Sequence, residues 1–128
     1  MNILITGANG QLGNEMKVLS AENTQHTYFF TDVQELDICN EEAIEAFVAE
    51  NEIELIVNCA AYTAVDNAED NRELCDKLNH IAPGYLARAA QRRGAAIIQV
   101  STDYVFDGTA HIPYTEECDP CPNSVYGT

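Results

Sequence analysis

The chain has 128 residues, of which 46% are hydrophobic, and its 21 acidic and 6 basic side chains give a formal net charge of −15. This length suits one domain, or part of one, with enough apolar material for a core. The negative charge argues against nucleic acid and anionic membranes as partners, because their phosphates would be repelled.

The amino terminus carries a glycine-rich motif. An apolar run, Ile3–Ile5, predicts a strand over 2–6, and Gly7, Gly10 and Gly13 then lead into a predicted helix over 11–21. Glycines spaced in this way permit a tight turn and let the backbone approach a pyrophosphate closely. The start of the helix favours negative charge. The spacing is a variant of G-x-G-x-x-G, so the motif needs support from elsewhere in the chain.

That support comes from the second predicted strand, over 27–32. Its last residue, Asp32, follows Gly13 by nineteen positions. A carboxylate at this place accepts hydrogen bonds from an adenosine ribose and repels a 2′-phosphate. The sequence therefore predicts a dinucleotide site with a preference for NADH.

A second pair of elements follows. Asn40 is a predicted N-cap for a helix over 41–51, whose first turn is acidic, as a helix amino terminus favours. The apolar run over 53–58 predicts a third, largely buried strand. Strands and helices therefore alternate along the chain, and the sequence contains no internal repeat.

The last regular elements are a long helix over 70–93 and a strand over 95–101. Pro83 lies inside the helical pattern and either kinks it or marks an earlier boundary. From Thr102 onward the periodicity ends. Apolar strands that alternate with helices predict an α/β fold: a Rossmann-type, doubly wound parallel sheet with helices on both faces, truncated before its later strands.

Ligands of such sheets bind outside the carboxyl ends of the strands. The segments expected there are 7–13, 32–38, 58–63 and 101–108. Small residues in 58–63 permit close approach of a cofactor, and hydroxyls there can bind ribose or nicotinamide. The hydroxyl of Thr102 is expected to point into the crevice; the alternative is that it only caps the loop.

The five cysteines are odd in number and lie mostly within regular elements, which indicates reduced thiols in a cytoplasmic protein. Cys118 and Cys121 have C-x-x-C spacing. A redox pair normally starts a helix, whereas this pair lies in a Pro-rich loop, and zinc needs two further ligands. Both functional readings are therefore disfavoured. The chain has no secretion signal and no stretch of about 20 apolar residues that could span a bilayer.

Four segments together resemble the dTDP-4-dehydrorhamnose reductase family of the extended short-chain dehydrogenase/reductase superfamily: 7–13, 58–66, 101–108 and 122–127. The resemblance runs along the whole chain, and the run S-T-D-Y-V-F-D-G is its most specific part. It implies reduction of the 4-keto group of dTDP-6-deoxy-L-lyxo-4-hexulose to dTDP-L-rhamnose by NADPH or NADH. The product feeds surface polysaccharides, and the expected partner is the dTDP-sugar.

The resemblance also assigns residues. It implies that Thr102 and Tyr126 are catalytic and that Thr102 and Asp103 bind substrate. The family's lysine falls four residues after Tyr126, beyond Thr128, as does the substrate domain. We therefore expect 1–128 to be an incomplete dinucleotide-binding domain that is inactive alone. The expected cofactor-binding residues are Gly7, Asn9, Gly10, Gln11, Leu12, Gly13, Asp32, Asp37, Ile38, Ala60, Ala61, Tyr62 and Thr63.

Several alternatives stay open. Some family members place a glutamate at the position of Glu15 in a magnesium site between subunits; its other ligands would lie beyond residue 128, so no metal site is expected within this chain, although a homodimer is possible. Another nucleotide-sugar epimerase or dehydratase would share the glycine loop but not S-T-D-Y-V-F-D-G. A non-catalytic regulatory subunit of the methionine adenosyltransferase type would keep the fold without the chemistry.

Overall fold

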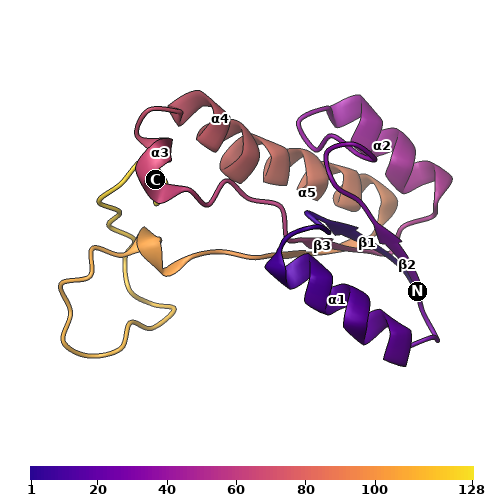
Figure 1. Ribbon diagram of the computed structural model, residues 1–128, viewed down its shortest axis with the longest axis horizontal. Coiled ribbons are helices and arrows are strands. Elements are labelled where there is room, and N and C mark those ends of the chain that lie inside the picture. Colours follow the sequence, from indigo (N-terminus) through magenta and orange to yellow (C-terminus); the bar gives the residue numbers. More distant parts are fainter.

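The computed structural model describes residues 1–128 and contains a parallel sheet flanked by helices (Figure 1). Its four strands are β1 (Asn2–Thr6), β2 (Thr27–Phe30), β3 (Leu55–Asn58) and β4 (Ala96–Gln99), in the order β2-β1-β3-β4. All three strand pairs are parallel, so every strand ends at the same edge of the sheet. The predicted Rossmann-type α/β fold is confirmed.

Helices cover both faces of the sheet. In Figure 1, α1 (Gln11–Glu22) lies on one face, while α2 (Glu41–Glu50) and α5 (Ala82–Arg93) lie on the other. The main core fills the space beneath α2 and α5. Its buried side chains are Leu4, Leu36, Ile38, Ile44, Val48, Ile53, Ile56, Ala82, Leu86, Ala89 and Ala90. A smaller cluster, Ile3, Ile5 and Val57, packs against Met16 of α1. None of the helices combines the length and apolar character needed to cross a bilayer.

Local signals in the sequence explain where α2 begins and α5 ends. The Asn40 side chain caps α2 by accepting a hydrogen bond from the Ala43 N–H at 3.1 Å, as predicted. Gly94 ends α5 in the left-handed conformation, with φ of 67°, which costs glycine little. Two ion pairs join the helices: Arg88 to Glu41 at 2.9 Å and Arg92 to Glu45 at 2.7 Å.

The predicted helix over 70–93 was wrong in its details. A short helix α3 (Val65–Ala68) precedes it, and the rest divides into α4 (Arg72–Asp76), a π-helical turn η1 (Lys77–Ile81) and α5. The Ala82 N–H donates to the Lys77 carbonyl, five residues back. Pro83 follows directly and has no N–H with which to continue the narrower ladder. Pro83 therefore lies in the first turn of α5, at the boundary between the π-helical turn and the α-helix, which is the second of the two alternatives.

The fourth strand is shorter than the sequence predicts. The prediction was a strand over 95–101, whereas β4 covers Ala96–Gln99. β4 pairs with β3, and its Ile97 side chain packs against the main core.

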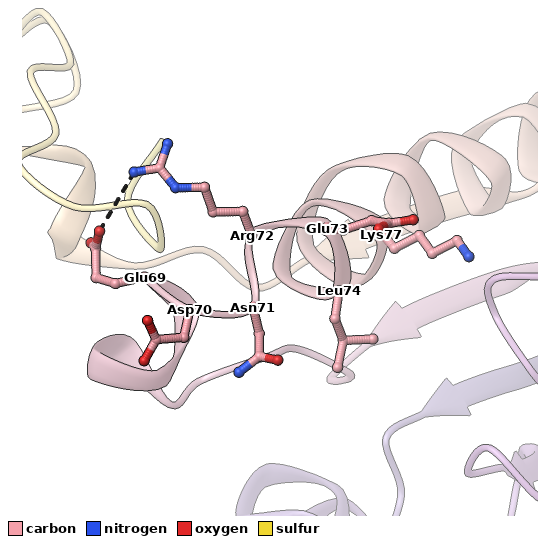
Figure 2. Close-up of a pocket in the computed structure, with 7 residues that line it drawn as sticks. All are labelled: Glu69, Asp70, Asn71, Arg72, Glu73, Leu74 and Lys77. Atoms are coloured by element: carbon pink, nitrogen blue, oxygen red, sulfur yellow. Dashed lines mark ion pairs between the residues drawn. The ribbon is translucent and has the colours of Figure 1, made fainter.

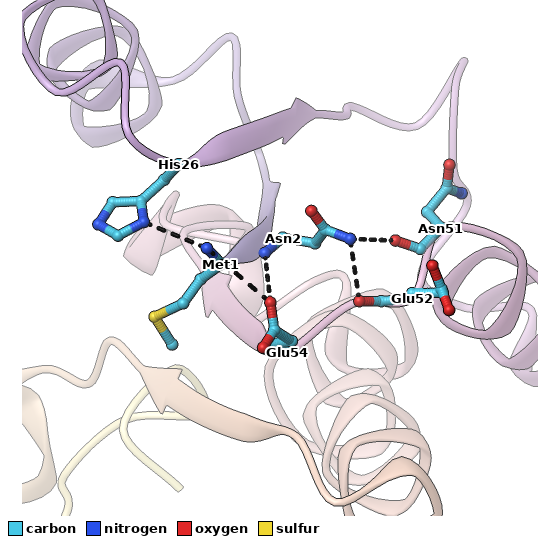
Figure 3. A network of polar contacts seen from close by, with 6 residues as sticks. All are labelled: Met1, Asn2, His26, Asn51, Glu52 and Glu54. Atoms are coloured by element: carbon cyan, nitrogen blue, oxygen red, sulfur yellow. Dashed lines mark hydrogen bonds and ion pairs between the residues drawn. The ribbon is translucent and has the colours of Figure 1, made fainter.

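The amino-terminal edge of the sheet is closed by polar contacts among its own residues (Figure 3). The Asn2 side chain donates to the carbonyls of Asn51 and Glu52, at 3.0 and 3.2 Å. The Asn2 N–H donates to the Glu54 carboxylate at 2.9 Å, and the terminal ammonium of Met1 lies 3.9 Å from the same carboxylate. These contacts tie the start of β1 to the segment between α2 and β3.

Candidate functional site

The glycine loop lies at the carboxyl edge of the sheet and is packed backbone against backbone. Gly7 has φ of 61°, and a Cβ on it would lie 2.6 Å from the Ala60 Cα. A Cβ on Gly13 would lie 2.5 Å from the Gly7 carbonyl oxygen. Both distances are too short for any side chain. The structure therefore brings Gly7, Gly13 and Ala60 together and explains why two of the glycines are required.

The first turn of α1 leaves three backbone donors without a partner. The N–H groups of Gln11, Leu12 and Gly13 donate to no group of the chain. No side chain caps the helix at Gly10, and the first turn holds no acidic residue. Free N–H groups and the positive end of the helix dipole together bind anions. This arrangement fits the pyrophosphate of a dinucleotide.

Asp32 lies beside this loop with its carboxylate held in place. One oxygen accepts from the Val33 N–H at 2.8 Å, and the other accepts from the Asn9 N–H at 3.2 Å. Each carboxylate oxygen has lone pairs to spare for further donors. The carboxylate is therefore positioned to accept hydrogen bonds from a ribose, as the sequence predicts.

The segment after β3 is fixed by a residue that sequence reasoning missed. The Asn79 side chain accepts from the Tyr62 N–H at 2.8 Å and donates to the Tyr62 carbonyl at 2.9 Å. Asn79 belongs to the π-helical turn η1, a kind of turn that often occurs at functional sites. The only sign of this role in the sequence was an asparagine inside a helical pattern. By binding the Tyr62 backbone, Asn79 holds Ala60–Thr63 beside the glycine loop.

Asn58 begins the segment 58–63 that the sequence places at the site, but its structural role was not predicted; it is fully buried. Its side-chain oxygen accepts from the Thr6 hydroxyl and, at 3.3 Å, from the Ala60 N–H. Its amide donates to the Gln99 side chain at 2.7 Å. These contacts join the ends of β1, β3 and β4 beneath the site. Buried polar groups paired in this way hold the surrounding backbone rigidly.

Two of the expected cofactor residues have other roles for their side chains. The Asp37 carboxylate accepts from the Cys39 N–H at 2.9 Å and so forms a local turn. The Ile38 side chain is buried in the main core rather than exposed at the edge. The Ile38 side chain is therefore not available to a ligand there. A cofactor role for these residues stays a prediction.

Thr102 and Tyr126 both contact Tyr104. The Thr102 hydroxyl caps the short 3-10 helix η2 (Asp103–Val105) by accepting from the Tyr104 N–H at 3.2 Å, and it approaches the Asp103 carboxylate at 3.4 Å. The rings of Tyr104 and Tyr126 pack edge to face with centroids 5.5 Å apart. The capping alternative for Thr102 is thus observed, and both residues expected to be catalytic contact Tyr104. Their catalytic roles stay a prediction.

The loop from 107 to 123 is organised by one carboxylate. Asp107 accepts from the Thr109 N–H at 3.0 Å, from the Thr109 hydroxyl at 2.8 Å and from the Tyr114 hydroxyl at 3.0 Å. These hydrogen bonds, the Thr109 N–H first, lower the pKa of Asp107. The Asn123 amide closes the loop on the Asp107 carbonyl at 3.0 Å. A hollow of about 350 Å³ lies beside it, between η2 and this loop.

A larger hollow, of about 520 Å³, lies elsewhere. Figure 2 shows that its residues belong to the turn between α3 and α4 and to the helical turns that follow, with the ion pair between Arg72 and Glu69 at 3.7 Å. Six of its seven lining residues are polar or charged, and none is among those that the sequence assigns to a site. It is a shallow polar surface rather than a cofactor crevice.

The five cysteines are all free thiols. Burial raises the pKa of Cys59, whereas the backbone N–H and the hydroxyl of Thr115 lower the pKa of Cys118. No group of three or more His, Cys, Asp or Glu side chains suited to a metal ion occurs in residues 1–128. The expected absence of a metal site stays a prediction.

Comparison with known proteins gives one family. The RmlD substrate binding domain matches residues 1–128. A dTDP-4-dehydrorhamnose reductase structure from Clostridium acetobutylicum is 49% identical and has a TM-score of 0.96, covering 99% of this chain and 45% of that one. A dTDP-4-dehydrorhamnose reductase from Bacillus anthracis in complex with NADP is 38% identical with a TM-score of 0.93, covering 98% and 44%.

One curated relative is named for a different dTDP-linked sugar. It is a probable dTDP-4,6-dihydroxy-2-methyloxan-3-one 4-ketoreductase from Streptomyces antibioticus, 41% identical over 128 residues. The alignment covers 99% of this chain and 43% of the relative. The chain thus spans less than half the length of the relatives it matches.

Proposed function

Because this chain belongs to the family of the RmlD substrate binding domain, we propose that it is the dinucleotide-binding part of an NAD(P)H-dependent dTDP-4-dehydrorhamnose reductase. The reaction is reduction of the 4-keto group of dTDP-6-deoxy-L-lyxo-4-hexulose, which gives dTDP-L-rhamnose. The observation that carries the proposal is the set of three unpaired N–H groups at the start of α1, beside the fixed carboxylate of Asp32.

The residues at the carboxyl edge of the sheet would each bind a different part of the dinucleotide. The N–H groups of Gln11, Leu12 and Gly13 would hold the pyrophosphate, and Asp32 would accept from the adenosine ribose. Ala60–Thr63, in which Asn79 holds the backbone of Tyr62, would border the cofactor, and the small side chains of Ala60 and Ala61 would let it approach closely. When bound, the dinucleotide would supply the hydride.

The side chains of Thr102 and Tyr126 would stabilise the negative charge that develops on the ketone oxygen. The Thr102 hydroxyl would donate to the ketone oxygen, for which it must release its 3.4 Å contact with Asp103. The Tyr126 phenol would deliver the proton to that oxygen. Hydrogen bonds aimed at charge that develops in the transition state accelerate the reaction more than ground-state contacts do.

The test is an assay of the whole protein with the 4-keto sugar. NADPH or NADH oxidation is followed at 340 nm, and mass spectrometry identifies the dTDP-L-rhamnose formed. Tyr126→Phe is expected to lower kcat about 100-fold or more, because the proton donor is lost. Tyr85→Phe on α5 is the matched control and should leave kcat unchanged. Absence of sugar-dependent oxidation, or epimerisation of a nucleotide sugar instead, would contradict the proposal.

The name of the Streptomyces antibioticus relative supports a second candidate within the same chemistry. In this alternative the substrate is a different dTDP-linked 4-keto sugar. The ratio of kcat/KM for the two sugars decides between the candidates. A cytoplasmic location and a homodimer are further parts of the proposal; the free thiols support the first, and light scattering tests the second.

A further inference from the structure

A lysine lies next to the glycine loop. Lys17, on α1, has its ammonium 3.2 Å from the side-chain oxygen of Asn9 and 5.9 Å from the centre of the Phe30 ring. Phe30 ends β2, two residues before Asp32. The half-buried stem of Lys17 therefore runs along the sheet toward the carboxyl edge, where its charged end is exposed.

Asn9 links this cation to the carboxylate of Asp32. The backbone N–H of Asn9 donates to Asp32, while its side-chain oxygen accepts from Lys17. Two opposite charges thus contact the same loop residue, beside the place proposed for the adenosine ribose. A carboxylate accepts a hydrogen bond from a 2′-hydroxyl and repels a 2′-phosphate, whereas a cation attracts the phosphate.

Lys17 is one of few cations available for such a role. The chain has only 6 basic side chains against 21 acidic ones. Arg72, Arg88 and Arg92 are paired with glutamates, whereas Lys17 forms no ion pair. A chain with this excess of negative charge repels a 2′-phosphate unless a local cation offsets it.

We propose that Lys17 is a specificity-determining residue, whose ammonium attracts the 2′-phosphate of NADPH. The Asp32 carboxylate instead accepts a hydrogen bond from the ribose 2′-hydroxyl of NADH. The inference rests on the dinucleotide site of the proposed function and refines the NADH preference expected from Asp32 alone. The consequence is use of both cofactors, with a ratio that is set by two side chains on either side of Asn9.

The test measures binding of NADP⁺ and NAD⁺ to the whole protein by isothermal titration calorimetry, without the sugar. Lys17→Met keeps the apolar stem and removes the charge; it should weaken NADP⁺ about tenfold and leave NAD⁺ within about twofold. Lys17→Arg keeps the charge and should retain NADP⁺. Arg93→Met, in the last turn of α5, removes the same charge at the opposite edge of the sheet and should change neither.

Salt and substrate separate this inference from the proposed function. The preference for NADP⁺ should fall with added salt in the wild type but not in Lys17→Met, where salt screens only the repulsion from Asp32 and the acidic surface. Equal effects of Lys17→Met on both nucleotides, or none, would overturn the inference, as would failure of the wild type to bind either nucleotide. A Lys17-dependent ratio without reductase activity would uphold this inference while the proposed reaction failed.

Discussion

At the amino-terminal edge of the sheet, Asn2 and Glu54 satisfy polar groups of their neighbours, whereas at the carboxyl-terminal edge three N–H groups of α1 have no partner in the chain. The same four strands begin at one edge and end at the other. The difference comes from the connecting loops: glycines at the carboxyl edge bring backbones together and leave donors free. Unpaired donors at the start of a helix are available to an anion, whereas paired donors hold segments of the chain together.

The largest effect is expected on dinucleotide affinity, when a Cβ is added to the glycine loop at the carboxyl edge. Gly13→Ala puts a Cβ 2.5 Å from the Gly7 carbonyl, so the loop must shift and dinucleotide affinity should fall about 100-fold or more, as measured by calorimetry. Gly94→Ala, beyond α5 at the amino edge, meets no atom within 4 Å. It should lower the free energy of unfolding by about 1 kcal/mol and leave affinity unchanged. Equal affinity of Gly13→Ala and the wild type would refute the comparison.

The buried network beneath the site should matter more than the polar contacts of the opposite edge. Asn58→Ala leaves the Thr6 hydroxyl and the Ala60 N–H without an acceptor, so the free energy of unfolding should fall by about 2–3 kcal/mol in urea. Asn2→Ala removes two contacts that are partly open to water and should cost about 1 kcal/mol or less. A larger loss in Asn2→Ala would reverse the ranking.

A smaller effect is expected where the amino edge itself is strained. Glu52, after α2, has φ of 49° and is the one residue other than glycine with a positive φ. Glu52→Gly should raise the free energy of unfolding by roughly 0.5–1 kcal/mol, because glycine adopts this conformation readily. Glu50→Gly, in the last turn of α2, should lower it by about 1 kcal/mol in the same urea titration. A stability loss in both variants would show that Glu52 is not strained.

The smallest effect concerns pH and the loop beside the carboxyl edge. The pKa of Asp107 is lowered by the Thr109 N–H and the hydroxyls of Thr109 and Tyr114. Its ionised form therefore contributes stability above the unfolded pKa of about 3.9, and this is lost as pH falls through the lower folded value. Asp107→Asn should have a lower Tm than the wild type at pH 7 but the same Tm near pH 2. A constant difference would exclude this role.

Part of the candidate site was identified in the sequence by a known spacing. Gly13 and Asp32 lie nineteen residues apart, and this spacing recurs in the strand–helix–strand unit that binds dinucleotides. The contacts of Lys17, Asn58 and Asn79 were not predicted. Their partners, Asn9, Thr6 and Tyr62, lie eight or more positions away along the chain, and no recurrent spacing marks these pairs.

The sequence by itself determined the order of strands and helices, the N-cap at Asn40 and the α/β class, because the spacing of apolar residues and capping chemistry act over a few residues. Only the tertiary structure decided that the helix before β4 contains a π-helical turn. It alone placed Ala60 against Gly7. Burial and backbone approach depend on which segments pack together, and that is settled only when the sheet assembles.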